Sequence, residues 1–375
     1  MDYKYISADN HLDLIWTPRN VWQDRVASRW KDAAPRVVET DRGTFWEWEH
    51  KLQLPAADGR DNAMCRQRTF GKRGVETPEG SLPPSDPALL LAHMDLAHIY
   101  ACVIYGNTRK WAIADPELLR ECYRAYNDFL LELASHAPER LIVLPVLPTQ
   151  FPEACVSELR RVAELGAKGV EFSLHDVGVP IYEPAWEPVW EAAEETGLAI
   201  CCHIGDKAGA PYPPNLYGAS KAHFTCAPMG SVFRGLAQII FCGALERHPG
   251  LRVSFGECNV GWLPYFVEWM DRQERERPPD PTAALSLRPS EYFARQITVS
   301  FEEDVVGARL IGEPWAHLAE SAIWGADYPH NAVTWPNPEP VMERMFGGAD
   351  PAVKRKAVFE RSAAFFRLKT PAPAL

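Results

Sequence analysis

Short apolar runs recur eight times along the chain, and between them apolar residues recur every three or four positions. A short apolar run bounded by turn residues is typical of a buried β-strand, whereas the wider spacing indicates an amphipathic helix. The predicted strands cover residues 5–11, 101–105, 141–147, 169–174, 198–203, 252–257, 297–301 and 322–327. The predicted helices cover residues 87–97, 116–135, 152–165, 184–196, 230–246 and 262–276. Strand and helix therefore alternate through most of the chain.

This alternation predicts an α/β fold in which parallel strands are joined by right-handed helical crossovers. Eight units favour a closed (β/α)8 TIM barrel over an open dinucleotide-binding sheet, because no GxGxxG motif follows the first strand. We expect a single domain over residues 1–375. Residues 12–86 are too long for one connection, so we predict an insertion, or lid, over the mouth of a distorted barrel. A second long connection, 205–229, is also expected to set specificity.

Composition and charge limit the kinds of molecule that we expect this protein to bind. Hydrophobic residues make up 46% and charged residues 24% of the 375 residues, which is ordinary for a globular protein. A net charge of -11 opposes binding to nucleic acid, and no apolar run approaches the roughly 18 residues that span a membrane. The nine cysteines are scattered without a CxxC pair, so we expect reduced thiols and a cytoplasmic protein.

Residues that bind divalent metals stand at the predicted ends of three strands: Asp9 and His11, His203, and Asp327. In a parallel barrel the chemistry lies at the C-terminal ends of the strands. Asp9 and His11 are two residues apart, so both side chains can face the barrel axis. The mixed nitrogen and oxygen donors suit Zn²⁺, Mn²⁺ or Fe²⁺. Taken singly, each histidine could equally be a hydrogen-bonded core residue.

Four motifs stand out along the chain: ISADNH at 6–11, FCGALERHP at 241–249, GWLP at 261–264 and WGADYPH at 324–330. Together they resemble the amidohydrolase-related family of the amidohydrolase superfamily, in the branch of aminocarboxymuconate semialdehyde decarboxylase and the resorcylate-type decarboxylases. The resemblance implies a distorted TIM barrel with one divalent metal. It also implies that the ligands are the first-strand pair, the fifth-strand histidine and the eighth-strand aspartate, which are Asp9, His11, His203 and Asp327 here.

The chain departs from this family pattern at two positions. The first-strand motif is often HxH, whereas here a carboxylate, Asp9, precedes His11. This harder ligand favours Mn²⁺ or Fe²⁺ over Zn²⁺. Relatives with a His-Gly-Gly motif on the sixth strand use that histidine as a general acid/base, and here Glu257 takes its position. Glu257 could move a proton, bind metal or form a structural ion pair.

Further candidates lie near the predicted barrel mouth. His175 and His330 are candidate catalytic residues, and with Glu257 they could instead bind a second metal ion. Substrate hydrogen bonding or orientation of a metal ligand is the other role for each histidine. The candidates for substrate binding are His223, Arg234 and Trp335.

These observations support three hypotheses for function. The first is a metal-dependent hydrolase or non-oxidative decarboxylase that acts on a small, carboxylate-bearing organic substrate through metal-activated water or metal-oriented substrate. The second is an iron- or manganese-dependent oxygenase, with one or two metals, on the same scaffold. The third is a structural subunit of a hetero-oligomer, although a homo-oligomer is the more usual assembly. The pattern does not identify the substrate.

Overall fold

The computed structural model describes residues 3–55, 66–106, 111–205, 216, 218–278, 281–312, 318, 320–330 and 334–370. Within these ranges all eight predicted strands are present, and all eight run parallel in two arcs. One arc has the order β1-β5-β6 and the other has the order β11-β10-β9-β8-β7. The strands are β1 (Tyr5–His11), β5 (Ile99–Tyr105), β6 (Leu141–Val143), β7 (Gly169–Glu171), β8 (Ala199–His203), β9 (Val253–Gly256), β10 (Ile297–Phe301) and β11 (Ala322–Trp324).

The two arcs meet at both edges through isolated parallel bridges. At one edge Asn10 pairs with Tyr328, and the His11 N–H donates to Tyr328 O at 2.7 Å. At the other edge Val146 pairs with Glu171, and the Glu171 N–H donates to Pro145 O at 2.9 Å. The eight strands therefore form a closed but irregular ring, which confirms the distorted (β/α)8 barrel.

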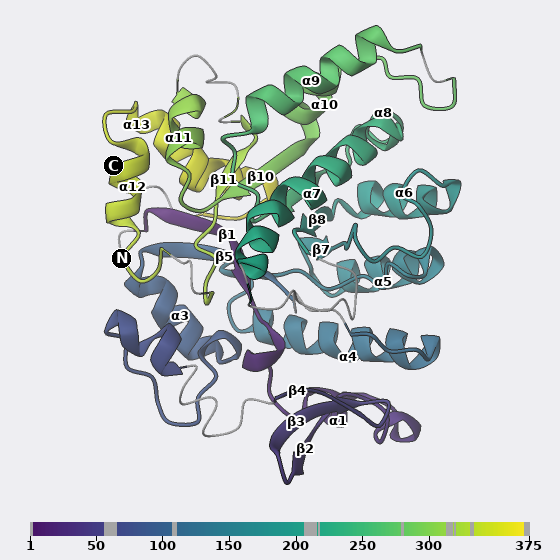
Figure 1. Ribbon diagram of the computed structural model, residues 1–375, viewed down its shortest axis with the longest axis vertical. Coiled ribbons are helices and arrows are strands. Elements are labelled where there is room, and N and C mark those ends of the chain that lie inside the picture. The colour runs from purple at the N-terminus through teal and green to yellow at the C-terminus, as the bar shows by residue number, and fades with distance from the viewer. Residues whose placement is uncertain are drawn as a thin grey trace.

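Helices follow the strands in turn and cover the outside of the ring (Figure 1). Asp86 and Asp115 cap two of them: each carboxylate accepts two backbone N–H groups, and a proline follows each cap. Such caps fix where the helices begin. The helices are α3 (Pro87–Leu96), α4 (Pro116–Ser135), α5 (Pro152–Glu164), α6 (Glu187–Thr196), α7 (Ala219–Phe241), α8 (Ala244–Arg247), α9 (Leu263–Glu276), α10 (Pro289–Gln296), α11 (Val305–Gly312), α12 (Glu339–Phe346), α13 (Pro351–Arg355) and α14 (Arg361–Phe365).

Helix α7 begins earlier than the sequence pattern predicts. The predicted start was residue 230, whereas the helix begins at Ala219 and continues past Pro228 and Gly230. Proline and glycine weaken a helix in isolation, so the pattern indicated a loop up to Met229. Of the predicted connection 205–229, residues 206–215 and 217 lie outside the described residues.

Residues 12–86 contain a small antiparallel sheet that the sequence analysis did not predict. Its strands are β2 (Arg36–Thr40), β3 (Gly43–Trp48) and β4 (Lys51–Pro55), in the order β2-β3-β4. Trp22 on α1 (Val21–Arg25) contacts Trp46 and stacks on Tyr126 of α4. Figure 1 shows this sheet at the opposite end of the molecule from α9 and α10. Residues 56–65 lie outside the described residues, and the role of 12–86 as a lid stays a prediction.

The interior of the barrel is filled by small and branched side chains from alternate strand positions. Ala8, Val103, Leu144, Cys201 and Ile323 belong to this cluster, which also includes Phe365 and Phe366 from the C-terminal segment. Such filling makes the barrel a packed core and leaves the strand ends as the place for a site. In the described part of the chain, no helix combines the length and apolar character needed to cross a membrane.

Candidate metal centre

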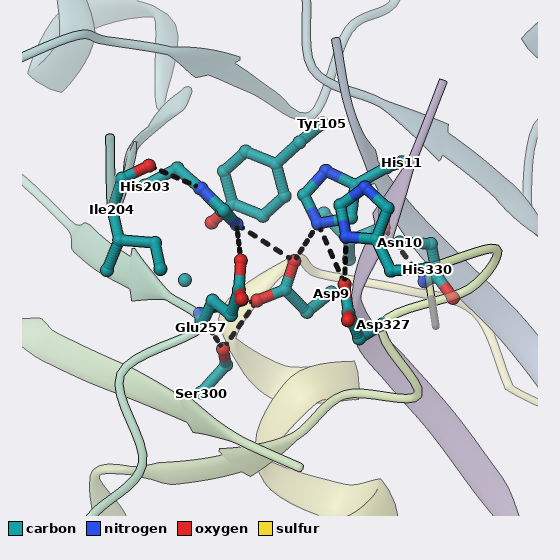
Figure 2. Close-up of polar contacts among 12 residues, drawn as sticks. Asp9, Asn10, His11, Tyr105, His203, Ile204, Glu257, Ser300, Asp327 and His330 are labelled. Carbon is teal, nitrogen blue, oxygen red and sulfur yellow. Dashed lines mark hydrogen bonds and ion pairs between the residues drawn. The ribbon is translucent and has the colours of Figure 1, made fainter. Parts of the chain in front are cut away.

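Asp9, at the C-terminal end of β1, holds one carboxylate oxygen fixed and turns the other toward two histidines (Figure 2). Its Oδ2 accepts the Glu257 N–H at 2.6 Å and the Ser300 hydroxyl at 2.8 Å. Its Oδ1 lies 3.3 Å from His11 Nε2 and 3.5 Å from His203 Nε2. The carboxylate is thus oriented to offer Oδ1 as a single ligand atom.

Asp327 reaches the same point from the segment that follows β11, the neighbour of β1 in the ring. Its Oδ1 lies 3.1 Å from His11 Nε2. The residue has a φ of 52°, a left-handed conformation that Asp tolerates better than most residues. Its N–H donates to Asp9 O at 2.9 Å, which ties the two aspartates together.

His203, the last residue of β8, presents Nε2 to this group. Its Nδ1 is 2.8 Å from the Ile204 carbonyl oxygen. Because a carbonyl only accepts, Nδ1 carries the proton, and the lone pair of the neutral ring is on Nε2. Such a hydrogen bond on the remote nitrogen is the usual way to orient a metal-binding histidine.

The four facing atoms have no hydrogen-bond partner within the described ranges. They are Asp9 Oδ1, His11 Nε2, His203 Nε2 and Asp327 Oδ1, and all four are buried. Buried polar atoms without partners are rare and call for an explanation such as an ion. Ligand atoms at about 2.1 Å from a common ion lie roughly 3.0–3.4 Å apart, which is close to the 3.1–3.5 Å separations here. The donor atoms around His11 Nε2 and Asp9 Oδ1 therefore have separations that suit a divalent metal ion.

Electrostatics also favours a cation at this point. Burial opposes ionisation of Asp9, but His203 and His11 outweigh it and lower the pKa of this carboxyl group. Burial raises the pKa of Glu257, and the neighbouring carboxylates of Asp327 and Asp9 add to the effect. Acidic groups packed this closely repel one another unless a positive ion lies between them.

Two further predicted residues, Glu257 and His330, adjoin the four. Glu257 Oε2 lies 3.4 Å from His203 Nε2. His330 stacks on His11 with ring centres 4.1 Å apart, and its Nδ1 lies 2.8 Å from Asp327 Oδ1. Its Nε2 lies 2.8 Å from Asp13 Oδ2. The donor atoms form two overlapping groups that share His11. The first consists of Asp9, His11 and His203. The second consists of His11, Glu257, Asp327 and His330.

The other four residues predicted for the site differ in where they lie relative to the metal-binding side chains. His175 Nε2 is 3.2 Å from the His203 carbonyl oxygen, so this ring borders the site. Trp335 is buried against Tyr328, and its indole N–H donates to His93 O. His223 and Arg234 both lie on α7, and Arg234 is exposed. The roles of these four residues stay predictions.

The sequence analysis missed Ser300 and Glu302, both on or after β10. Ser300 and Thr298 are the polar residues of this buried strand, and their polarity was the available signal. Glu302 follows the strand, and burial together with Asp327 and Glu257 raises its pKa well above the ordinary value. Two glycines were missed as well. A Cβ at Gly325 would lie against Asp9 Cβ, and one at Gly256 would lie 2.7 Å from His203 Cδ2.

Replacing Ser300 with alanine should weaken metal binding while the fold is retained. The variant leaves Asp9 Oδ2 with one of its two hydrogen bonds, so the carboxylate can rotate away from the metal position. Loss of such a supporting hydrogen bond typically costs 10–100-fold in metal affinity. Competition with a fluorescent chelator would measure the change, with Ser290→Ala as the control. Equal affinity of S300A and wild type would contradict this role.

A parallel barrel with imidazole and carboxylate donors at the C-terminal strand ends defines a metal-dependent barrel enzyme. Among such enzymes, this chain belongs to the amidohydrolase family: the model of the family described as amidohydrolase matches residues 111–368. The match includes His203, Glu257 and Asp327, whereas Asp9 and His11 precede it.

Curated relatives and solved structures agree with this membership. The 2-amino-3-carboxymuconate-6-semialdehyde decarboxylase of Dictyostelium discoideum is 25% identical over 221 residues, which cover 58% of this chain and 58% of that protein. The gamma-resorcylate decarboxylase of Rhizobium radiobacter is 24% identical over 227 residues, 58% of this chain and 68% of that protein. The match thus spans less than two thirds of the first relative.

Two solved structures resemble the fold over nearly its whole length. An amidohydrolase from Mycobacterium avium subsp. paratuberculosis K-10 has a TM-score of 0.71 at 17% identity and covers 98% of both chains. A dihydroxybenzoic acid decarboxylase from Polaromonas sp. JS666, solved with bound manganese and the inhibitor 2-nitroresorcinol, has a TM-score of 0.65 at 17% identity. It covers 99% of this chain and 98% of that one. At such identities the likeness supports the fold alone.

Proposed function

We propose that the protein is a divalent-metal-dependent non-oxidative decarboxylase of a small carboxylated substrate, with an aromatic acid as the first class to test. The single observation that carries this is the set of four buried, unpartnered donor atoms on Asp9, His11, His203 and Asp327. The activities named for the relatives favour decarboxylation over hydrolysis. They do not favour the oxygenase or the structural-subunit hypothesis.

Asp9, His11, His203 and Asp327 would hold the metal. Manganese is the first metal to test, because two carboxylates make the donor set hard and a solved relative contains it. When bound, the ion supplies a positive charge that orients and polarises oxygen atoms of the substrate. A second ion, held by Glu257 and His330 with His11 and Asp327, is the alternative to a single ion.

The residues of the chain would supply the proton that the reaction needs. Decarboxylation breaks the bond between the carboxylate carbon and the carbon atom that bears it, and CO₂ leaves. The electron pair of that bond stays on the second carbon atom, which must then gain one proton. Glu257 is the candidate donor because its carboxyl group lies beside His203 and, among the described residues, forms no ion pair with Lys or Arg. His330 lies between Asp13 and Asp327. It would orient the carboxylate of Asp327, which is the proposed metal ligand. His175 and His223 remain candidates for contact with substrate, as do Arg234 and Trp335.

A product assay distinguishes the hypotheses. The metal-free protein is loaded with Mn²⁺ and incubated with benzoates that carry hydroxyl or amino groups beside the carboxylate, and with amides and lactones as hydrolase substrates. We expect release of CO₂ from one of the aromatic acids, without consumption of oxygen. Hydrolysis of an amide or lactone without CO₂ release would instead identify a hydrolase, and oxygen uptake would support the oxygenase hypothesis.

We further infer that residues 1–375 work as one domain in which 12–86 borders the substrate path. Two contacts support this: Asp13 binds His330, and Phe70 packs against Tyr328.

We also propose a cytoplasmic homo-oligomer. The eight described cysteines are all free, which suits a reducing compartment, and Tyr265 and Trp269 form an exposed aromatic pair on α9. Native mass measurement of the purified protein tests the assembly.

A further inference from the structure

Three arginines gather at the N-terminal end of the barrel, away from the metal centre. Arg252 directly precedes β9, Arg361 begins α14, and Arg367 follows that helix. Two of them meet at Gly197: Arg252 Nη2 donates to the Gly197 carbonyl, and Arg367 Nη1 occupies the place where a Cβ of residue 197 would lie. The Arg252 guanidinium also lies 5.3 Å from the ring centre of Phe365. We call these three residues the arginine cluster.

The arginine cluster has no acidic partner among the described residues. In those ranges no carboxylate oxygen lies within 4.0 Å of the three guanidinium groups. Other arginines of the barrel wall, in contrast, form ion pairs with Asp or Glu. Glu320 favours the charge on Arg361 but is already bound by Lys356. The positive charge of the cluster is therefore not balanced by the described part of the chain.

Several donor groups of the arginine cluster are buried and unsatisfied. Arg252 Nε and Nη1 and Arg361 Nε have no hydrogen-bond partner in the described ranges. Burial, with the charges of Arg367 and Arg361, lowers the pKa of Arg252 to about 10, so this side chain stays charged at pH 7. A buried cation that cannot lose its proton needs both hydrogen-bond acceptors and a counter-charge. Water supplies acceptors but no counter-charge.

We propose that the arginine cluster binds a small inorganic oxyanion of the phosphate or sulfate class. Guanidinium groups donate several N–H bonds to the oxygens of such anions and are weakly hydrated, which makes Arg the preferred residue for this task. Arg367 is exposed, so an anion can reach the cluster from solvent. The anion would hold the C-terminal segment, through Arg361 and Arg367, against the start of β9, through Arg252. This role is separate from the proposed decarboxylation.

The experiment measures the melting temperature of the full-length protein as phosphate or sulfate is added in a background of sodium gluconate at constant ionic strength. We expect a rise of about 3 °C once the anion exceeds its dissociation constant about 100-fold, growing with the logarithm of the anion concentration. This logarithmic dependence separates binding from the general stabilising effect of these salts, which grows in proportion to concentration and needs much more salt. Isothermal titration with inorganic phosphate should give one site per chain.

Variants make the expectation specific to the cluster. Arg252→Gln and Arg367→Gln should each abolish the logarithmic rise, whereas the control Arg272→Gln, on the exposed face of α9, should retain it. Without phosphate, R367Q should melt at the same temperature as wild type or higher, because it relieves repulsion among three like charges. Equal responses to phosphate in wild type, R252Q and R367Q would overturn the proposal. A wild type whose melting temperature rises only in proportion to salt concentration, with no binding heat in the titration, would overturn it as well.

Discussion

Replacing Asp327 with alanine should remove the metal and lower kcat/KM by at least about 1,000-fold, or about 4 kcal/mol of transition-state stabilisation. Asp327 Oδ1 is one of the four buried atoms that face the proposed metal position, 3.1 Å from His11 Nε2, and alanine removes it without a substitute. Metal content by elemental analysis and CO₂ release by a coupled assay are the two measurements. A variant with full metal content and full activity would refute the proposed ligand set.

Two controls keep this result interpretable. Asp41→Ala removes an exposed carboxylate from the turn between β2 and β3 and should change neither metal content nor activity. Chelation of the wild-type protein, followed by addition of Mn²⁺, should abolish and then restore activity without any mutation. If D327A fails to fold, chelation still tests the metal dependence.

Replacing Glu257 with glutamine should lower kcat by about 100- to 10,000-fold while the metal stays bound. Glutamine keeps the size of the side chain, and its backbone N–H can still donate to Asp9 Oδ2. Its amide group, however, cannot deliver a proton. Activity and metal content measured on the same sample separate the roles of Glu257. Loss of metal together with activity would make Glu257 a ligand, and unchanged kcat would exclude it as the proton donor. Glu276→Gln, on the exposed end of α9, is the matched control.

The sequence predicted the barrel and the meeting of distant metal-binding residues for one physical reason. Parallel strands that alternate with helices must place their C-terminal ends at one edge, so Asp9, His203 and Asp327 were expected to converge there. Asp9 lies 3.5 Å from His203, and His11 lies 3.3 Å from Asp9 and 3.1 Å from Asp327, in agreement with that expectation. The assignment of each residue as a ligand or a catalytic group stays a prediction.

Other parts of the fold and site could not be predicted because tertiary contacts decide them. Ser300 acts on Asp9, which is 291 positions away in the chain, and no local pattern encodes such a pair. Helix α7 continues through Pro228 because the packing of its remaining turns outweighs the local cost of a proline. The β2-β3-β4 sheet lay within a segment whose polar and glycine residues indicated irregular structure.

The two hydrogen bonds on Asp9 Oδ2 bear on how this family can diversify. An imidazole at position 9, as in the HxH form of the motif, has no oxygen to accept from both the Glu257 N–H and the Ser300 hydroxyl. It is also larger than a carboxylate, and Gly325 and Gly256 lie so near residue 9 that a Cβ on either would come within 3.0 Å of an Asp9 atom. We therefore expect Asp9→His alone to bind metal poorly, because it removes an acceptor that joins β1 to β10 and to the residue after β9. Elemental analysis of that variant would test this consequence of the two hydrogen bonds.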